Sequence, residues 1–209
     1  DSLVLPYGLE YQGAEVLSSS AEHPYLRVKL SNGRVVETNL VGSYNADNVM
    51  AALAVGQHFG VALEEGVAAI EAYVPSNNRS QMTKTERNTL IVDAYNANPT
   101  SMVAALENFS NVDADVKVAL LGDMLELGDE SLGEHVTIVR SAASRGFAKV
   151  CFVGKEFLKA SSEATFESAL FFETSDALAQ WLHENPLAGA TVLIKGSRGT
   201  RMEKTIAEL

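Results

Sequence analysis

The sequence predicts an α/β protein whose core is a Rossmann-like, mostly parallel sheet with helices on both faces. From residue 89 onward, short apolar runs alternate with longer segments in which apolar residues recur at helical spacing. Runs such as Val116–Leu121 are mostly apolar, which is typical of strands covered on both faces. Because strands that alternate with helices favour βαβ units, we expect the strands to be parallel.

Residues 1–40 have the pattern of β structure. Tyr25–Leu30 alternates apolar and polar side chains, and Val35–Thr38 returns in the same way. The dipeptide Asn32-Gly33 lies between these runs, and Asn-Gly is typical of a type I′ turn, which requires a positive φ at both central residues. This segment is therefore expected to form a β-hairpin.

Two helical patterns follow the hairpin, at residues 45–59 and 62–73. The segment Pro75–Asn78 then breaks the periodicity and is the strongest linker candidate in the chain. We therefore expect two domains, which comprise residues 1–78 and 79–209.

The second expected domain contains the alternation of strands and helices. Its strands are expected at residues 89–92, 117–121, 149–153, 168–172 and 191–195. Its helices are expected at residues 99–110, 130–145, 155–162, 175–184 and 199–208. Parallel strands end at one edge of the sheet, and open α/β sheets bind their ligands at that edge.

Composition limits the class of protein and the kinds of partner. Hydrophobic residues make up 46% and charged residues 21% of the chain, as in ordinary globular proteins. The net charge of −11 argues against nucleic acid and anionic membranes as partners. We expect no membrane insertion, because no apolar run reaches the length of a membrane span. The single cysteine, Cys151, lies in an apolar run and is expected to be a buried, inert thiol.

The turn after the first strand of the second domain is dense in polar groups. Asn98 and Pro99 are explained by helix capping, because asparagine is a good N-cap and proline suits the first helical position. Capping does not explain Asp93, Tyr95 and Asn96. These three side chains therefore indicate a functional site at the sheet edge.

Two further turns carry charged residues at the same predicted edge. Asp123 and Glu126 follow the second strand, and they could bind a metal, an ammonium group or a basic side chain. Alternatively, they form an acidic first turn for the next helix. Lys195 and Arg198 follow the last strand and suit a carboxylate or a phosphate, although a salt bridge within the loop is the alternative.

Upstream, the segment Gly42–Asn48 opens the first helical pattern. Asn45 could be a cap, and Asn48 lies one turn later, so both amides can face the same side. Arg79 is a lone arginine just after the linker. The sequence contains neither a Gly-x-x-x-x-Gly-Lys-Ser/Thr phosphate loop nor a Gly-x-Gly-x-x-Gly fingerprint, one of which the usual nucleotide-using enzymes require.

Together these motifs resemble the Mur ligases, the ATP-dependent amide-forming enzymes of peptidoglycan precursor synthesis. The resemblance extends from about residue 40 to the end. It rests on Gly42–Ala54, Arg79, Asp93–Met102, Gly122–Gly128 with Ser131 and His135, and Lys195–Arg198 with Met202-Glu203. One departure is Tyr44-Asn45, where the family usually has His-Asn.

The resemblance implies that this chain is part of a longer, three-domain ligase. Residues 1–78 would be the β-hairpin and helical end of a central ATPase domain, and residues 79–209 would be the Rossmann-like third domain. The phosphate loop and the metal ligands would lie upstream, which accounts for their absence here. We therefore expect the chain alone to be inactive and the full-length, cytoplasmic enzyme to use ATP and Mg²⁺.

The implied reaction adds D-alanyl-D-alanine to UDP-N-acetylmuramoyl-tripeptide through an acyl phosphate. By resemblance, Asn45 and Asn48 would contact the adenine, Arg79 the phosphates and Asp93 the ribose. The residues implied near the peptide substrates are Asn96, Asn98, Lys195, Ser197 and Arg198.

Two other functions are compatible with parts of the sequence. A non-catalytic Rossmann-like binding or regulatory module would explain the acidic turn together with Lys195, but not the two amides or Arg79. Another ligase of the same superfamily, such as a folylpolyglutamate synthase, is the nearer alternative.

Overall fold

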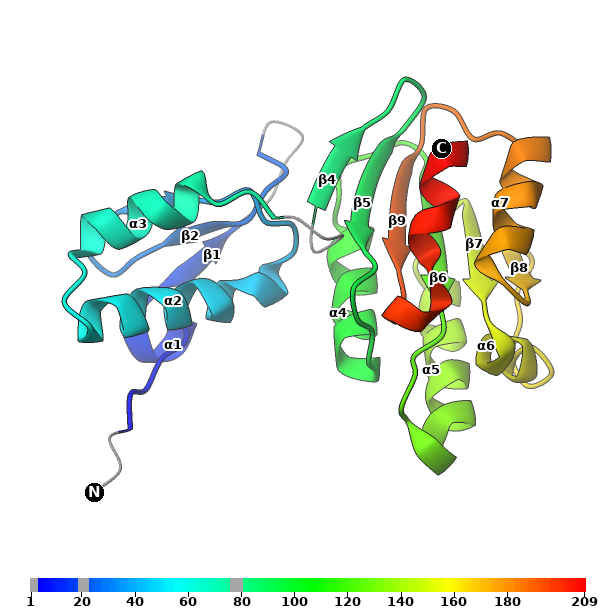
Figure 1. Cartoon of the computed structure of the whole chain (residues 1–209), viewed down its shortest axis with the longest axis horizontal. Helices are drawn as coiled ribbons and strands as arrows, with labels where there is room; N and C mark the ends of the chain where they lie inside the picture. Colours follow the sequence, from blue (N-terminus) through cyan, green and yellow to red (C-terminus); the bar gives the residue numbers. More distant parts are fainter. Residues whose placement is uncertain (1–3, 19–22, 76–80) are drawn as a thin grey trace. The chain divides into compact units, whose positions relative to one another are not determined.

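The structure, a computed structural model, describes residues 4–18, 23–75 and 81–209. The chain divides into two compact units, Asp1–Pro75 and Ser76–Leu209, which are considered separately below (Figure 1). The predicted boundary between residues 78 and 79 lies outside the described residues, so the two-domain assignment stays a prediction.

The first unit packs two helices on a small antiparallel sheet with strand order β1-β2-β3. Its elements are α1 (Leu9–Gln12), β1 (Glu15–Leu17), β2 (Arg27–Lys29), β3 (Val35–Glu37), the 3-10 helix η1 (Ser43–Asn45), α2 (Ala46–His58) and α3 (Leu63–Ala72). Its core combines Val28 and Val36 from the sheet with Val49, Leu53 and Val67 from the helices.

The predicted hairpin is confirmed, because β2 and β3 pair antiparallel, but its turn differs from the predicted type I′ turn. Leu30 N–H donates to the Arg34 carbonyl, so the loop contains three residues rather than two. Gly33 has φ 86°, whereas Asn32 is not among the described residues with a positive φ. A three-residue hairpin needs one left-handed residue, and Gly33 supplies it.

The second unit contains a six-stranded sheet with strand order β4-β5-β9-β6-β7-β8. Its strands are β4 (Gln81–Lys84), β5 (Thr89–Asp93), β6 (Lys117–Gly122), β7 (Lys149–Val153), β8 (Ala169–Phe172) and β9 (Thr191–Lys195). Its α-helices are α4 (Pro99–Ser110), α5 (Ser131–Ala143), α6 (Lys155–Ala160) and α7 (Ser175–Glu184), with 3-10 helices η2 (Gly128–Glu130), η3 (Arg198–Thr200) and η4 (Met202–Glu208).

The five neighbouring strands β5, β9, β6, β7 and β8 are parallel, as predicted. The remaining strand, β4, is antiparallel to β5 at one edge of the sheet. Sequence analysis missed β4 because its residues, Gln-Met-Thr-Lys, have little apolar character. In the described part of the chain, no helix is long and apolar enough to cross a membrane.

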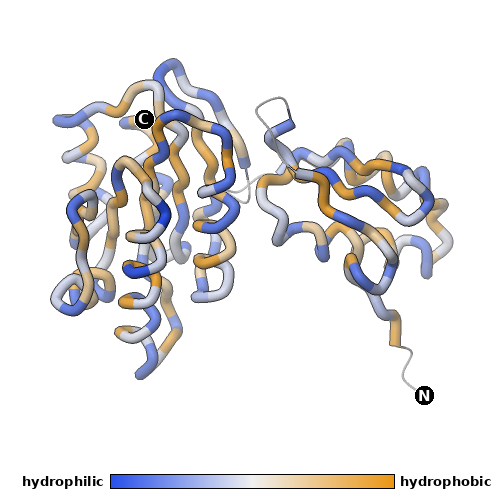
Figure 2. Tube along the Cα trace, turned by 180° about the vertical axis from the view of Figure 1, so that it is seen from behind, coloured by the Kyte–Doolittle hydropathy of each residue, from blue (hydrophilic) through white to orange (hydrophobic). Residues whose placement is uncertain are grey.

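Helices cover both faces of this sheet, because successive strand residues point to opposite sides. Val192 and Ile194 pack with Leu178 of α7 and Met202 of η4. On the other face, Phe152 contacts the α6 ring Phe157 at 4.8 Å between centroids. In Figure 2, the hydrophobic segments of this unit lie mainly in its interior.

Cys151 of β7 has a fully buried side chain, and burial raises the pKa of its thiol to about 12. A thiol with this pKa contains almost no thiolate at neutral pH. The predicted burial of this thiol is therefore confirmed.

The predicted single helix at residues 199–208 is wrong, because two 3-10 helices meet at Arg201, which has φ 53° and ψ 44°. At this break, Met202 is buried in the core and Thr200 packs on Gly122 and Gly196, the glycines that follow the strand residues Leu121 and Lys195. A Cβ atom on Gly122 would lie 2.5 Å from Thr200 Oγ1, and one on Gly196 would lie 2.9 Å from Gly122 Cα. This close packing accompanies the break at Arg201, where the backbone is left-handed rather than helical.

Candidate functional site

The turns after β5, β9 and β6 lie side by side, because β9 pairs with β5 on one side and β6 on the other. Asp93 is the last residue of β5 and lies directly opposite Lys195, the last residue of β9. Three polar turns predicted from the sequence therefore meet at the carboxyl edge of one sheet, where doubly wound folds bind ligands.

Asp93 and Lys195 form a buried ion pair at the start of these turns. Lys195 Nζ lies 2.6 Å from Asp93 Oδ2 and also donates to the Asn96 carbonyl at 3.3 Å. The Lys195 side chain is 2% exposed and that of Asp93 is 12% exposed. A direct contact between Lys195 and a substrate carboxylate would require this pair to separate.

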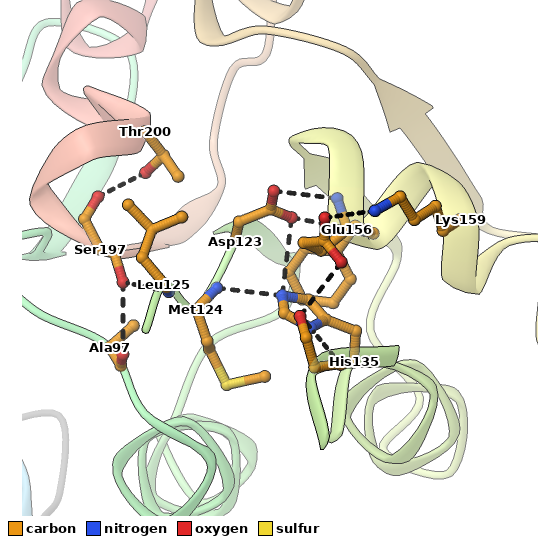
Figure 3. A network of polar contacts seen from close by, with 11 residues as sticks. Ala97, Asp123, Met124, Leu125, His135, Glu156, Lys159, Ser197 and Thr200 are labelled. Carbon is orange, nitrogen blue, oxygen red and sulfur yellow. Dashed lines mark hydrogen bonds and ion pairs between the residues drawn. The ribbon is translucent and has the colours of Figure 1, made fainter. Parts of the chain in front are cut away.

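Ser197 joins the other two turns (Figure 3). Its hydroxyl donates to the Ala97 carbonyl at 3.3 Å and accepts from Leu125 N–H at 3.0 Å. Its own N–H donates to the Asp123 carbonyl at 3.1 Å. The buried Ser197 thus holds the turn after β5 against the turn after β6.

Asn96 and Asn98 are exposed, and both side-chain carbonyls accept main-chain hydrogen bonds. Asn98 Oδ1 accepts from Ser101 N–H at 2.8 Å, and Ser101 Oγ accepts from Asn98 N–H at 3.1 Å. This capping box, with Pro99 as the first residue of α4, confirms that helix capping explains Asn98 and Pro99.

Arg198 is exposed and lies beside Tyr95 of the turn after β5. Its guanidinium carbon is 5.6 Å from the centre of the tyrosine ring, within the range of a cation–π contact. Among the Lys195, Ser197 and Arg198 side chains, Arg198 is therefore the one that faces solvent.

Asp123 lies at the same edge, and its carboxylate accepts hydrogen bonds from main chain, with His135 Nε2 3.6 Å from its Oδ1 (Figure 3). Its two oxygens accept from Glu156 N–H at 3.0 Å and Phe157 N–H at 2.9 Å, so the carboxylate stabilises the start of α6. Burial raises the pKa of this carboxyl, and the two backbone hydrogen bonds oppose that shift. Asp123 therefore caps α6, whereas the alternative interpretation had predicted an acidic first turn for the next helix in sequence.

His135 of α5 supports the acidic turn and was assigned no contact from the sequence. Its Nε2 accepts from Met124 N–H at 3.0 Å, and its Nδ1 lies 2.7 Å from the Ser131 carbonyl (Figure 3). Because a backbone N–H can only donate, Nε2 is unprotonated and Nδ1 carries the hydrogen. The His135 side chain is fully buried. In the sequence, only its position four residues after Ser131 indicates that the two residues can contact each other on one face of a helix.

A pocket of about 280 Å³ lies beyond Asp123, at the carboxyl ends of β6, β7, β8 and β9. Its charged lining residues carry both signs: Asp123, Lys155, Glu173, Asp176, Arg201 and Lys204. None of the side chains implied near the peptide lines it, so sequence analysis missed this pocket. No hydrogen bond or ion pair joins the Arg201 side chain to another described residue, whereas Lys204 Nζ lies 2.6 Å from Asp176 Oδ2.

In the first unit, the predicted adenine contacts lie together at the start of α2. Asn45 is the N-cap residue, but its side chain makes no capping bond. Its Nδ2 donates to the Val41 carbonyl at 2.9 Å, and its Oδ1 accepts from Asn48 Nδ2 at 3.2 Å. The two amides thus face each other, while Arg79 lies outside the described residues.

This chain is similar in sequence and in structure to known proteins. The family model described as "Mur ligase, glutamate ligase domain" matches residues 78–198. The UDP-N-acetylmuramoyl-tripeptide–D-alanyl-D-alanine ligase of Treponema pallidum is 32% identical over 96% of this chain and 45% of its own length. The crystal structure of MurF from Acinetobacter baumannii superimposes with a TM-score of 0.76 at 30% identity, over 94% of this chain and 43% of that one.

A more distant structure, a Mycobacterium tuberculosis folylpolyglutamate synthase with ADP and AMPPCP, superimposes with a TM-score of 0.63. It is 21% identical over 93% of this chain and 48% of that one, and it shows a shared fold alone. The chain spans about half the length of the curated relatives it matches. The family match over residues 78–198 shows that this chain belongs to the Mur ligase family.

Proposed function

We propose that this chain is the part of an ATP-dependent ligase that contributes nucleotide contacts and the acceptor site. The full-length enzyme adds D-alanyl-D-alanine to UDP-N-acetylmuramoyl-tripeptide in peptidoglycan precursor synthesis. The proposal rests on the geometry of the sheet edge. There Lys195 binds Asp93, and Ser197 binds Ala97 and Leu125 of the two neighbouring turns. The names and extent of the similar ligases support it.

In this proposal, the nucleotide contacts are the ones that the family resemblance implies. A carboxylate accepts hydrogen bonds from adjacent hydroxyls, so Asp93 suits the ribose. The paired amides of Asn45 and Asn48 suit the donor and acceptor edge of adenine, and the guanidinium of Arg79 suits a phosphate. A cytoplasmic location, where ATP is available, is part of the same proposal.

The pocket beside Asp123 suits the dipeptide. D-alanyl-D-alanine carries an ammonium and a carboxylate, and the pocket has charges of both signs. Arg201 and Arg198 are the exposed guanidinium groups at this end of the sheet, and a guanidinium binds a carboxylate through two parallel hydrogen bonds. We assign the dipeptide to this pocket, whereas Asn96 and Asn98, which the family resemblance implies near the peptide substrates, follow β5 and do not line it.

The proposed chemistry has two steps. A carboxylate oxygen of the tripeptide attacks the γ-phosphorus of ATP, and ADP leaves. The dipeptide amine then attacks the acyl carbon, phosphate leaves, and the amine loses a proton. Since water would hydrolyse the acyl phosphate, the residues at the sheet edge must also help to exclude water.

Mg²⁺ stays a prediction of the family resemblance. In residues 4–18, 23–75 and 81–209, no group of three or more potential ligands is close enough to hold a metal ion. The described residues do not form a magnesium site by themselves.

Incubation of the full-length protein with ATP, UDP-N-acetylmuramoyl-tripeptide and D-alanyl-D-alanine tests the proposal. We expect ADP and the amide product in equal amounts by mass spectrometry. A parallel reaction with a folate and glutamate tests the folylpolyglutamate synthase alternative. ATP-dependent product in the folate reaction alone would contradict the proposal, and no turnover of either pair would favour the binding module.

A further inference from the structure

We propose that Lys195 is a positioning residue for the nucleotide. Its ammonium orients the Asp93 carboxylate and fixes the turn from Asp93 to Asn96, without touching a substrate. The proposal rests on the proposed function, in which Asp93 receives the ribose. It differs from the direct contact between Lys195 and a carboxylate that the charged turn after the last strand suggested.

The strand register places the two side chains together. Asp93 and Lys195 are paired residues on the neighbouring parallel strands β5 and β9. Val92 and Ile194, one residue earlier on each strand, both belong to the core cluster under α7. Because successive residues point to opposite faces, Asp93 and Lys195 share the other face of the sheet.

The ammonium makes two contacts that define the turn. It lies 2.6 Å from the carboxylate at the start of the turn and 3.3 Å from the carbonyl of Asn96, three residues later. Ser197, two residues after Lys195, donates from its hydroxyl to the Ala97 carbonyl. The end of β9 thus binds the β5 turn at its first, fourth and fifth residues.

Burial separates this lysine from the cations that could bind substrate. The Lys195 side chain is 2% exposed, so an approaching carboxylate cannot reach the ammonium without displacing Asp93. Arg198 and Arg201 are exposed at the same edge and can reach a ligand. Lys195 can therefore influence the reaction mainly through the groups it holds.

A purely stabilising role explains the pair poorly. The cost of removing both charges from water offsets much of their attraction, and apolar replacements of buried ion pairs are often equally stable. What an ion pair adds is direction, because the ammonium at 2.6 Å fixes where one carboxylate oxygen lies. Direction is what a ribose-binding carboxylate requires.

The test uses the full-length protein with Lys195→Met and Lys195→Arg, and Lys159→Met as a matched control. Lys159 pairs with Glu156 at the surface of the same unit, at 2.7 Å. The readouts are the KM values for ATP and the dipeptide, and the preference for ATP over 2′,3′-dideoxy-ATP, measured as a ratio of kcat/KM values. The ratio does not depend on the folded fraction, because both nucleotides compete for the same folded enzyme.

For Lys195→Met, we expect KM for ATP to rise about tenfold or more and the ATP preference to fall by a similar factor, as for a misaligned charged hydrogen bond. KM for the dipeptide should change by less than about twofold. Lys195→Arg keeps the charge but alters its position, so its ATP preference should lie between those of Lys195→Met and the wild type. A rise in KM for the dipeptide or the tripeptide with unchanged ATP preference would overturn the proposal.

Two further measurements keep the result decisive. If Lys195→Met does not fold, Lys195→Arg, which keeps the buried positive charge beside Asp93, decides instead: a reduced ATP preference supports the positioning role, and an unchanged preference overturns it. If the wild type forms no amide, the proposed function fails, and ADP affinity measured by calorimetry still tests the positioning role. ADP affinity about tenfold weaker in Lys195→Met than in Lys159→Met supports it, and equal affinities overturn it.

Discussion

Asp93 and Asp123 occupy similar places at one sheet edge, yet they have different partners. Asp93 ends β5 and pairs with the ammonium of Lys195, whereas Asp123 follows β6 and accepts from two main-chain N–H groups of α6. A carboxylate bound by the main chain is committed to the architecture. A carboxylate oriented by another side chain can be aimed at a ligand. We therefore propose that the partner, and not the position along the edge, separates the ligand-binding carboxylate from the structural one.

The largest expected effect is the loss of stability in Asp93→Asn. The substitution leaves the buried ammonium of Lys195 without its carboxylate, which should lower the free energy of unfolding by about 3–5 kcal/mol. Urea denaturation of the 209-residue chain measures this change. A loss below about 1 kcal/mol would show that the ion pair does not form in solution.

Asp123→Asn should cost less, about 1–3 kcal/mol, because an amide oxygen can still accept one of the two N–H groups of α6. It also removes a buried charge, which offsets part of the loss. The same denaturation series makes the comparison. If Asp123→Asn lowered the free energy of unfolding more than Asp93→Asn did, the Asp93–Lys195 ion pair would not be the costlier of the two interactions to break.

Close packing between the turns that carry Asp123 and Lys195 predicts an intermediate effect for Gly196→Ala. The new methyl group would lie 2.9 Å from Gly122 Cα and 2.8 Å from Thr200 Oγ1, so overpacking should cost about 1–3 kcal/mol. Gly133→Ala is the control, because Gly133 lies within α5 and a methyl group there would meet no atom within 4 Å. The control should gain about 0.5–1 kcal/mol. Equal stabilities would show that the turns are loosely packed.

A smaller effect, confined to one substrate, is expected for Arg201→Gly. Glycine tolerates the left-handed backbone at this position, so stability should hold or rise while the guanidinium is lost. In the full-length enzyme, KM for the dipeptide should rise about tenfold, and KM for ATP should stay the same. If KM for the dipeptide does not change, Arg201 does not bind the dipeptide.

The smallest effect concerns pH. Burial raises the pKa of Asp123 above its ordinary value of 3.8, so the folded state binds this proton more tightly than the unfolded state does. The stabilising contribution is complete below the unfolded pKa and is lost as pH rises through the folded pKa. Relative to Asp123→Asn, the wild type should therefore lose stability as pH rises through the ordinary carboxyl range and above it. The opposite slope would mean that the two backbone hydrogen bonds outweigh burial.

Local patterns in the sequence predicted most of the second unit. Its apolar runs mark parallel strands, and Asn98-Pro99 marks the start of α4, because each signal depends on neighbouring residues. The polar edge strand β4 was missed for the converse reason, since its pairing with β5 is set by tertiary contact. The break at Arg201 was missed because it follows from packing on Gly122, about 80 residues away in sequence.

Sequence analysis found the three polar turns but could not assign partners within them. Asp93 and Lys195 are close because β9 lies between β5 and β6. Local periodicity predicts single strands and does not predict their order in the sheet. The same strand order lets the Ser197 hydroxyl form hydrogen bonds with the main chain of Ala97 and Leu125. The pocket was missed because its lining residues come from the ends of four strands.

The most direct test of the difference between Asp93 and Asp123 is the ATP preference of full-length enzyme variants over 2′,3′-dideoxy-ATP. If Asp93 binds the ribose, the wild type should favour ATP by about tenfold or more, Asp123→Asn should keep this preference, and Asp93→Asn should lose it. A preference that survives in Asp93→Asn but disappears in Asp123→Asn would contradict the assignment of Asp93 to the nucleotide and of Asp123 to the scaffold.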